Sequence, residues 1–523
     1  MSMNDFGGSQ IPSFIGSLQN LRYLNLSGAC FVGTIPPSLG DLSRMYYLDL
    51  NHNHFFQSYK SSITWLSGLS SLKYLHLGGW DLTISATYLL QTVSRIPSIL
   101  ELHLPSCQLS DRPLTLPFLN FTFLSVLDLS NNGFKSTIPD WLFNLRSLVK
   151  LDLSNNHFHG EIPDAISNLA FLERLDLSGN SIGGKLSRNL GKLCNLRSME
   201  LYDNKISGEI VDYFDSLSEC FSNRLETLDL GDNGVMGKLP DALGYIKSLR
   251  FLRLSNNSLQ RLLPCSIGNL KSLQKILLGD NRMSIIPENL GQLSKLVVLD
   301  ISKSIWEGIL TEAYLMNLSS LKELAISCAN QSPNNISLVF NISFDWIPPF
   351  KLKYLSIKSC QLGPKFPTWL QNQDELSTLS LINASISDTI PNWFWQMDVK
   401  LDMLDLSYNN IGGRVLSSLS FNKHSSVYLL SNHFDGLFPL LSSNITTLYL
   451  SINQFLRPIL DDIGEAMPLL STLDISFNSL TRSIPLSIGN LSKLTVFVIS
   501  NNKLSGQVPL GKFTLLGVYR HVK

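Results

Sequence analysis

The 523-residue sequence lacks the marks of several protein classes. Lysine plus arginine equals aspartate plus glutamate at 41 each, so no net charge attracts the chain to a phosphate backbone or an anionic lipid. We therefore expect no nucleic-acid partner. No run approaches the roughly 18 apolar residues of a membrane span, and residues 1–8 have neither the charged nor the apolar region of a secretory signal. Membrane attachment is expected only through segments absent from this chain.

Groups that bind metals or perform catalysis are also not clustered along the sequence. The seven cysteines and nine histidines are scattered, without the closely spaced pairs that hold zinc or iron. Neither a phosphate-binding Gly-Lys-Ser/Thr loop nor a kinase signature is present. Serine, histidine and aspartate recur at regular intervals rather than in one catalytic arrangement. We expect no bound metal, no cofactor and no enzymatic activity.

What the sequence contains is a nine-residue phrase, Leu-x-x-Leu-x-Leu-x-x-Asn, which returns about twenty times, most often after 24 residues. Clear copies begin at Leu148, Leu172 and Leu249. A unit of this size cannot bury its apolar edge alone and gains a core only by stacking on its neighbours. The period therefore predicts a leucine-rich-repeat solenoid of about 20 repeats, with a concave parallel β-sheet and short helical or irregular convex segments. Residues 1–523 are expected to form a single domain.

Positions within the phrase have different structural roles. Residues of a strand alternate between faces, so Leu151 and Leu153 should point into the core and Lys150 and Asp152 outward. The ninth residue is Asn in thirteen units, and a buried amide there can satisfy backbone groups of the turn and of the adjacent layer. We expect local irregularity in the seven units that depart from Asn. These carry Ala29, Trp80, Cys107, Ser304, Ala329, Cys360 and Ala384.

The outward positions are the candidate ligand-binding residues. Tyr23, Tyr47 and Tyr74 occupy the same outward position in the first three units and should form an aromatic ladder. Aromatic pairs across strands also stabilise sheets without any ligand, so this alternative stays open. The next outward column adds Asn25, Asp49, His76 and His103, and a second aromatic pair, Tyr428 and Tyr449, lies toward the C-terminus.

Acidic residues fill one outward column in the middle of the chain. Lys150 and Arg174 lie beside this column and are candidate binding residues. One interpretation is a solvated face whose repulsion these two cations relieve, and the other is a site for a basic partner. The acidic residues are Asp128, Asp152, Asp176, Glu200 and Asp229.

Two further features predict covalent modification. Cys194 and Cys220 precede successive strands, so their Cα atoms can lie within disulfide distance, the alternative being two buried thiols beside a lengthened loop. Residues 331–350 lengthen one repeat and should form an exposed excursion, either at the rim of a binding site or as an inert glycosylated insertion. Asn-x-Ser/Thr sequons, the acceptors for N-glycosylation, occur at Asn25, Asn120, Asn256, Asn317, Asn330, Asn335, Asn341, Asn383, Asn444 and Asn490.

A second phrase, Asn-x-x-x-Gly-x-Ile-Pro-x-x-Leu-Gly-Asn-Leu, lies between the repeats, as at residues 33–42, 160–163 and 484–491. It resembles the plant extracellular subfamily of leucine-rich repeats. The run at 344–355 and the Gly-Pro-Lys-Phe-Pro-Thr-Trp-Leu segment at 363–370 are similar to those of receptor-like proteins of the fungal-xylanase (EIX) receptor group. This resemblance implies a plant plasma-membrane glycoprotein whose ectodomain recognises microbial or developmental signals, a proteinaceous or peptide elicitor among them. It also implies signalling through co-receptor kinases.

Full members of that group begin and end with segments that this sequence does not show, so we expect a fragment of an ectodomain without its caps. Such a stack would expose apolar layers and strand edges and dissolve poorly in isolation. Three other hypotheses remain at this point. The chain is the ectodomain of a receptor kinase, a secreted apoplastic inhibitor of microbial wall-degrading enzymes, or the product of a non-functional truncated gene.

Overall fold

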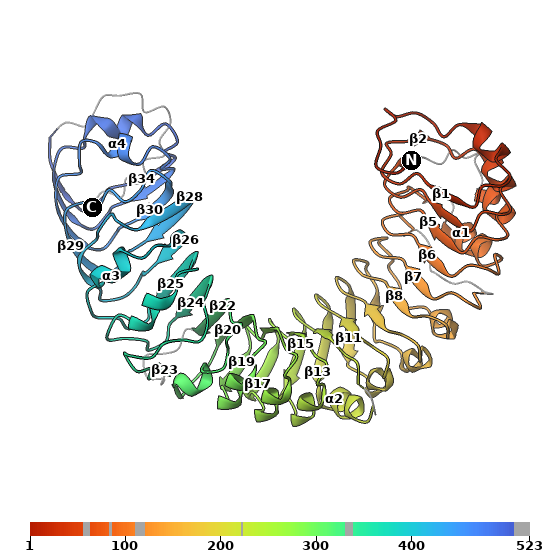
Figure 1. The fold of residues 1–523 in the computed structure, drawn as a ribbon, viewed down its shortest axis with the longest axis horizontal. Helices are drawn as coiled ribbons and strands as arrows, with labels where there is room; N and C mark the ends of the chain where they lie inside the picture. Colours follow the sequence, from red (N-terminus) through yellow and green to blue (C-terminus); the bar gives the residue numbers. More distant parts are fainter. Residues whose placement is uncertain (56–62, 83–85, 110–120, 221–222, 330–337, 507–523) are drawn as a thin grey trace. The chain divides into compact units, whose positions relative to one another are not determined.

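The computed structural model describes residues 1–55, 63–82, 86–109, 121–220, 223–329 and 338–506. The chain divides into two compact units, Met1–Gln260 and Arg261–Lys523. Each unit is a stack of short layers, and each layer contributes one strand to a parallel sheet on the concave side of that unit (Figure 1). The leucine-rich-repeat solenoid predicted from the period is therefore confirmed in both units.

Among the described residues, each unit contains ten of these sheet strands, and successive layers pair in register. In the first unit they are β1 (Tyr23–Asn25), β3 (Tyr47–Asp49), β5 (Tyr74–His76), β6 (Glu101–His103), β7 (Val126–Asp128), β8 (Lys150–Asp152), β10 (Arg174–Asp176), β12 (Ser198–Glu200), β14 (Thr227–Asp229) and β16 (Phe251–Arg253). In the second unit they are β18 (Lys275–Leu277), β20 (Val298–Ser304), β22 (Glu323–Cys328), β24 (Tyr354–Lys358), β25 (Thr378–Ile382), β26 (Lys400–Asp405), β28 (Ser420–Tyr428), β30 (Ile445–Tyr449), β32 (Thr472–Asp474) and β34 (Val496–Val498).

Behind the sheet the chain turns through short second strands. In the first unit these are β2 (Val32–Gly33), β4 (His54–Phe55), β9 (His159–Gly160), β11 (Ser181–Lys185), β13 (Lys205–Glu209) and β15 (Gly234–Gly237). β17 (Ser258–Leu262) lies at the division between the units. In the second unit they are β19 (Arg282–Ile285), β21 (Ile309–Leu310), β23 (Val339–Phe340), β27 (Gly412–Arg414), β29 (His433–Gly436), β31 (Gln454–Arg457), β33 (Ser479–Arg482) and β35 (Lys503–Leu504).

Short helices complete the layers on the convex side (Figure 1). The proline of the Ile-Pro phrase starts most of the 3-10 helices, because its ring fixes φ near −65°; Pro163, with φ −64°, precedes η5. The 3-10 helices are η1 (Ser13–Ser17), η2 (Pro37–Asp41), η3 (Ile63–Gly68), η4 (Asp140–Asn144), η5 (Asp164–Asn168), η6 (Arg188–Lys192), η7 (Asp241–Tyr245), η8 (Cys265–Asn269), η9 (Glu288–Gln292), η10 (Glu312–Tyr314), η11 (Thr368–Asn372) and η12 (Leu486–Asn490). The α-helices are α1 (Ala86–Val93), α2 (Val211–Ser218), α3 (Asn392–Trp395) and α4 (Ile463–Ala466). Every helix among the described residues is too short or too polar to cross a membrane.

The ninth-position asparagines are buried and hold neighbouring layers together. Asn156 donates its Nδ2 to the carbonyls of Leu129, Leu153 and Ser154 at 3.0–3.1 Å. Its Oδ1 accepts the backbone N–H groups of Asn132 and Phe134 at 2.9 and 3.1 Å. One amide thus satisfies backbone groups of its own turn and of the preceding layer, as the phrase predicts.

Departures from Asn change the layers in two ways. Four consecutive units, which carry Ser304, Ala329, Cys360 and Ala384, have strands of five to seven residues, whereas β8 has three. Without the amide that fixes the turn, the sheet ladder of these four units continues past its usual end, which is the irregularity that we expected. The units that carry Ala29 and Cys107 keep strands of three residues, so the expectation fails there. Trp80 instead fills its position, because it is buried and its indole Nε1 donates to the carbonyl of Leu50 at 3.2 Å.

Two further predictions concern a disulfide and a lengthened repeat. Cys194 and Cys220 form a disulfide with a Cα–Cα distance of 5.4 Å, which ties the end of η6 to the end of α2. The described part of the predicted excursion, residues 338–350, is not wholly exposed. β23 pairs with β21, Phe350 is buried, and the Trp346 ring contacts those of Phe350 and Trp369. Apolar side chains of the lengthened repeat thus pack against the layer. The prolines and sequons in its sequence did not predict this packing.

Candidate functional site

The first three layers present a stack of tyrosine rings on the outward face of the sheet. Register pairs Tyr23 with Tyr47 and Tyr47 with Tyr74. The first two rings are stacked with centroids 4.4 Å apart, and the Tyr47 and Tyr74 centroids lie 5.9 Å apart. Burial, with a contribution from the neighbouring Asp49 carboxylate, raises the pKa of Tyr47 to about 12. At neutral pH Tyr47 therefore presents an uncharged ring whose hydroxyl group can donate a hydrogen bond.

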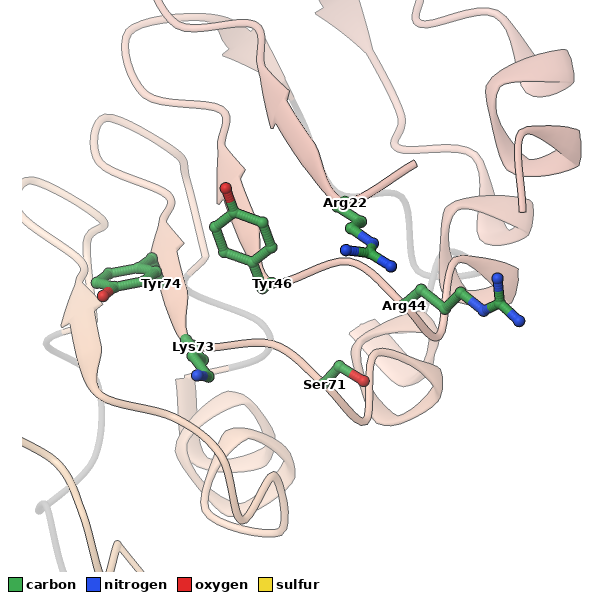
Figure 2. A pocket seen from close by; sticks show the side chains of 6 residues that line it. All are labelled: Arg22, Arg44, Tyr46, Ser71, Lys73 and Tyr74. Carbon is green, nitrogen blue, oxygen red and sulfur yellow. The ribbon is translucent and has the colours of Figure 1, made fainter. Parts of the chain in front are cut away.

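A basic hollow adjoins this stack at the edge where the strands begin. Figure 2 shows Arg22 and Lys73 at the starts of β1 and β5, with Tyr46 from the intervening layer. Arg44 approaches from a loop and donates to Asn20 Oδ1 at 2.8 Å. None of these three cations forms an ion pair with any carboxylate that the structure describes. The hollow encloses about 570 Å³ and is lined by Arg22, Arg44, Tyr46, Ser71, Lys73 and Tyr74. Its unpaired positive charge suits an anionic group.

A column of histidines and aspartates follows on β3, β5, β6 and β7. Register aligns Asp49, His76, His103 and Asp128. His76 Nδ1 lies 3.9 Å from Asp49 Oδ2, and His103 Nδ1 lies 3.4 Å from Asp128 Oδ2. Burial, helped by the adjacent His103, lowers the pKa of His76. Burial disfavours the Asp128 carboxylate, but hydrogen bonds from His103 and Ser130 outweigh it and hold its pKa below the ordinary value.

Asp49 differs from its predicted role as an exposed ligand-binding residue. Its side chain is buried, and its Oδ1 accepts the backbone N–H of Asn51 at 3.0 Å. The carboxylate therefore helps to build the turn after β3 and orients His76 rather than facing solvent.

The two histidines and Glu101 form a group that sequence spacing did not predict. His76, Glu101 and His103 each offer one ligand atom, and these atoms lie within 4.8 Å of one another. We expected no metal centre because no close pair of ligands appears along the chain. Stacking layers brings together residues separated by 27 positions, so the spacing along the sequence is the wrong measure for a solenoid.

The acidic column on β7 to β14 is relieved by a neighbouring cation only in part, and its aspartates are not fully solvated. The Oδ1 atoms of Asp152 and Asp176 accept hydrogen bonds from the backbone and hydroxyl groups of the serines two residues later. Arg174 Nη2 pairs with Glu200, a member of the column, at 3.1 Å, as the first interpretation predicted. Lys150 lies on β8 half-buried, beside Arg174 in register. The aspartates are thus tied to their turns, which makes a site for a basic partner less favourable.

The remaining predicted sites are distributed along the chain. Tyr428 and Tyr449 pair in register on β28 and β30, with stacked rings 5.3 Å apart. The Asn444 side chain is half-buried and donates to the carbonyl of Phe421 at 2.9 Å, so glycosylation there requires its release. Asn120, Asn330 and Asn335 lie outside the described residues. The exposed sequon asparagines are Asn256, Asn317, Asn341, Asn383 and Asn490.

Several site residues were missed by sequence reasoning. Arg22 and Lys73 directly precede the outward tyrosines Tyr23 and Tyr74. Comparison of the residue before each outward tyrosine in successive repeats would have found them. Arg253 is in register with Asp229, so the acidic column extended by one layer would have found its position. Its contacts, over the Tyr202 ring at 4.0 Å and with Asp232 at 2.8 Å, depend on the conformation of its side chain and were not predictable from the repeat.

Comparison with known proteins gives matches to repeat families along much of the chain. A model described as a leucine-rich repeat region matches residues 187–392. Models described as leucine-rich repeats match residues 122–182, 20–42 and 469–491.

Among curated proteins, the chain is 35% identical over 498 residues to Receptor-like protein EIX1 of Solanum lycopersicum. That alignment covers 85% of this chain and 47% of EIX1, so the chain spans about half the length of this relative. It is also 37% identical to Receptor-like protein EIX2 of the same species, over 36% of this chain and 18% of EIX2.

Solved structures with the same fold include plant receptor ectodomains. A TDR receptor superposes with a TM-score of 0.70 at 25% identity, over 97% of this chain and 89% of the receptor chain. PEPR1 in its PEPR1–AtPEP1 structure gives 0.68 at 26% identity, over 96% and 75%. The repeat models, relatives and solved neighbours agree that this chain belongs to the leucine-rich-repeat proteins and is similar to the EIX receptor-like proteins of plants.

Proposed function

We propose that this chain is the ligand-recognising part of a plant cell-surface receptor-like protein, that it binds a proteinaceous or peptide elicitor of microbial origin, and that it signals through co-receptor kinases. The observation that carries the proposal is the Tyr23–Tyr47–Tyr74 stack beside the basic hollow. Flat aromatic surface and unpaired cations on one face are the groups that dominate protein recognition sites.

The chemistry of this surface defines the kind of ligand. The tyrosine rings offer apolar area with polar tips, and the hollow offers three cations to a carboxylate or another anionic group. An extended peptide with an apolar residue next to an acidic one fits both features. Among the solved neighbours, HAESA of Arabidopsis is described in complex with the peptide hormone IDA and the co-receptor SERK1, at 26% identity and a TM-score of 0.59. That assembly supports a peptide ligand and a kinase partner for this chain.

Other features support a location on the extracellular face of the plasma membrane, or in the apoplast if the protein is secreted. The Cys194–Cys220 disulfide is typical of an oxidising compartment. Five sequon asparagines are exposed, as acceptors of N-linked glycans must be.

The test measures binding to the glycosylated full chain secreted from plant cells. A fungal xylanase is the first probe, because the relatives belong to the EIX group, and synthetic acidic peptides with one aromatic or aliphatic residue are the second. We expect Tyr47→Ala, Tyr74→Ala and Arg22→Glu each to weaken binding about 10- to 100-fold, as for central interface residues.

The matched control is Tyr245→Ala, which removes an exposed tyrosine of η7 outside the sheet and should leave the affinity unchanged. Equal affinity of all three sheet variants and wild type would place recognition elsewhere. No binding of either probe to wild-type protein would contradict the proposed ligand class.

A further inference from the structure

We propose that His76, Glu101 and His103 form a binding site for one divalent transition-metal ion, with Zn²⁺ the best-suited ion, on the outward face of β5 and β6. The inference is independent of the proposed receptor function, since it concerns only the ligand atoms that these two layers bring together.

The distances between the ligand atoms suit a zinc ion. The three candidate atoms lie within 4.8 Å of one another, and His103 Nε2 is 3.5 Å from Glu101 Oε2. Two nitrogen or oxygen ligands at about 2.0–2.2 Å in tetrahedral geometry are separated by roughly 3.4 Å. Only small side-chain rotations are therefore needed to place an ion between them. Two imidazoles and one carboxylate are the ligand set of several three-residue zinc sites, whereas Ca²⁺ and Mg²⁺ prefer oxygen ligands alone.

The surroundings of the two histidines orient them as metal ligands. Asp128 lies 3.4 Å from His103 Nδ1, and Asp49 lies 3.9 Å from His76 Nδ1, so each ring directs one nitrogen toward a carboxylate. A carboxylate behind a metal-bound histidine fixes its tautomer and strengthens it as a ligand. The Nε2 of His76 is then the free nitrogen, and it is buried with no hydrogen-bond partner among the described residues. A buried ring nitrogen without a partner costs free energy, which a bound ion would recover.

An ion bound at this site would keep one coordination position accessible to solvent. All three side chains are half-buried on the face of the sheet that carries the tyrosine stack, and the Tyr47 ring lies 5.5 Å from that of His76. Three protein ligands leave the fourth position of a tetrahedral ion for water or for a donor group of a bound partner.

The experiment uses the purified full chain after removal of metals with a chelator. Calorimetric titration with Zn²⁺ at pH 7.5 should show one ion per chain. Titration with Co²⁺ should produce visible absorption bands of a four-coordinate ion that Zn²⁺ then abolishes. His103→Ala should remove the bands and His76→Ala should weaken Zn²⁺ binding strongly. Asp128→Asn should weaken it about 10- to 100-fold through loss of the supporting carboxylate.

Controls distinguish this site from other binding. His433→Ala removes a histidine of β29 that is exposed, and it should bind one Zn²⁺ with unchanged affinity. Glu101→Gln keeps the size of the side chain and should weaken Zn²⁺ binding while leaving the circular dichroism spectrum unchanged. Absence of Zn²⁺ binding by wild-type protein, or unchanged binding by the His76→Ala/His103→Ala double variant, would overturn the proposal. Neither result depends on whether an elicitor binds.

Discussion

The carboxylate of Asp176 lies between two others in one column of the sheet. Register places it directly opposite Asp152 on β8 and Glu200 on β12, and its side chain is buried. Burial, together with these two negative neighbours, raises the pKa of Asp176 in spite of the hydrogen bonds from Ser178. The charged form of this residue therefore opposes folding, although the side chain is needed as an acceptor for the turn.

Replacing Asp176 with asparagine should stabilise the protein at neutral pH. A raised pKa means that the folded chain binds the proton more tightly than the unfolded chain. The stabilisation from that proton is complete below the unfolded pKa and is lost as the pH rises through the folded one. The substituted amide keeps an acceptor for the Ser178 N–H but carries no charge, so the denaturation midpoint of Asp176→Asn should exceed that of wild type at pH 7. The difference should shrink as the pH is lowered through the raised pKa, as followed by urea denaturation at several pH values.

A matched control for this variant is available in the second unit. Asp474 accepts the same two hydrogen bonds, from the Ser476 N–H and hydroxyl, but its neighbours in register are Tyr449 and Val498. Because no carboxylate lies opposite Asp474, Asp474→Asn removes no repulsion between like charges. It should not raise the urea denaturation midpoint. Equal stabilisation by both substitutions would show that the acidic column is not the cause.

At this scale, sequence reasoning predicted positions better than contacts. The shared position of Tyr23, Tyr47 and Tyr74 within the repeat phrase was enough to align them, because register in a parallel stack follows directly from the repeat. The grouping of Glu101 with His76 and His103 depends on how side chains lean within and between strands. That information is absent from the period, so the group was found only in the structure.

At the scale of the repeat element, the ninth-position asparagine links each layer to the one before it. We expect Asn156→Ala to lower the free energy of local unfolding by about 1–3 kcal/mol, because it leaves buried carbonyl and N–H groups without partners. The amides of Asn132 and Phe134, which lose their shared acceptor, should exchange faster with solvent than in wild type. Hydrogen exchange followed by mass spectrometry measures both effects.

The neighbouring His157 provides the control for this substitution. Its side chain is exposed, so His157→Ala should leave the exchange of both amides close to that of wild type. If Asn156→Ala behaved like His157→Ala, the amide ladder would not stabilise the stack.

The repeat elements also show where prediction from the sequence reaches its limit. The phrase predicted the sheet strand of each layer, because that strand follows from alternation, but it left the convex segments as short helical or irregular. It did not predict that β20, β22, β24 and β25 would lengthen where Asn is replaced. Loss of the asparagine amide leaves backbone groups of the turn without a partner, and the phrase predicts that local cost in free energy. Which new hydrogen bonds these backbone groups form depends on the next layer, so the phrase does not predict them.

At the scale of the whole molecule, stability should be a sum of contributions from neighbouring layers. Leu151 on β8 and Leu448 on β30 occupy equivalent buried positions in the two units, with 1% and 0% of their surface exposed. Truncation of either leucine to alanine removes buried methyl groups and leaves a cavity, which typically costs about 2–5 kcal/mol. In a globular domain with one shared core, that loss would lower the stability of every part.

In this solenoid we expect Leu151→Ala to accelerate hydrogen exchange in β8 and in the adjacent β7 and β10, while β28, β30 and β32 exchange as in wild type. Leu448→Ala should give the reciprocal result, so each variant serves as the control for the other. The physical reason is that each inward leucine contacts only its own layer and the layers next to it, and no core is shared along the chain. A uniform increase of exchange across all sheet strands in either variant would mean that the layers unfold together, and it would contradict a stability built from neighbouring repeats.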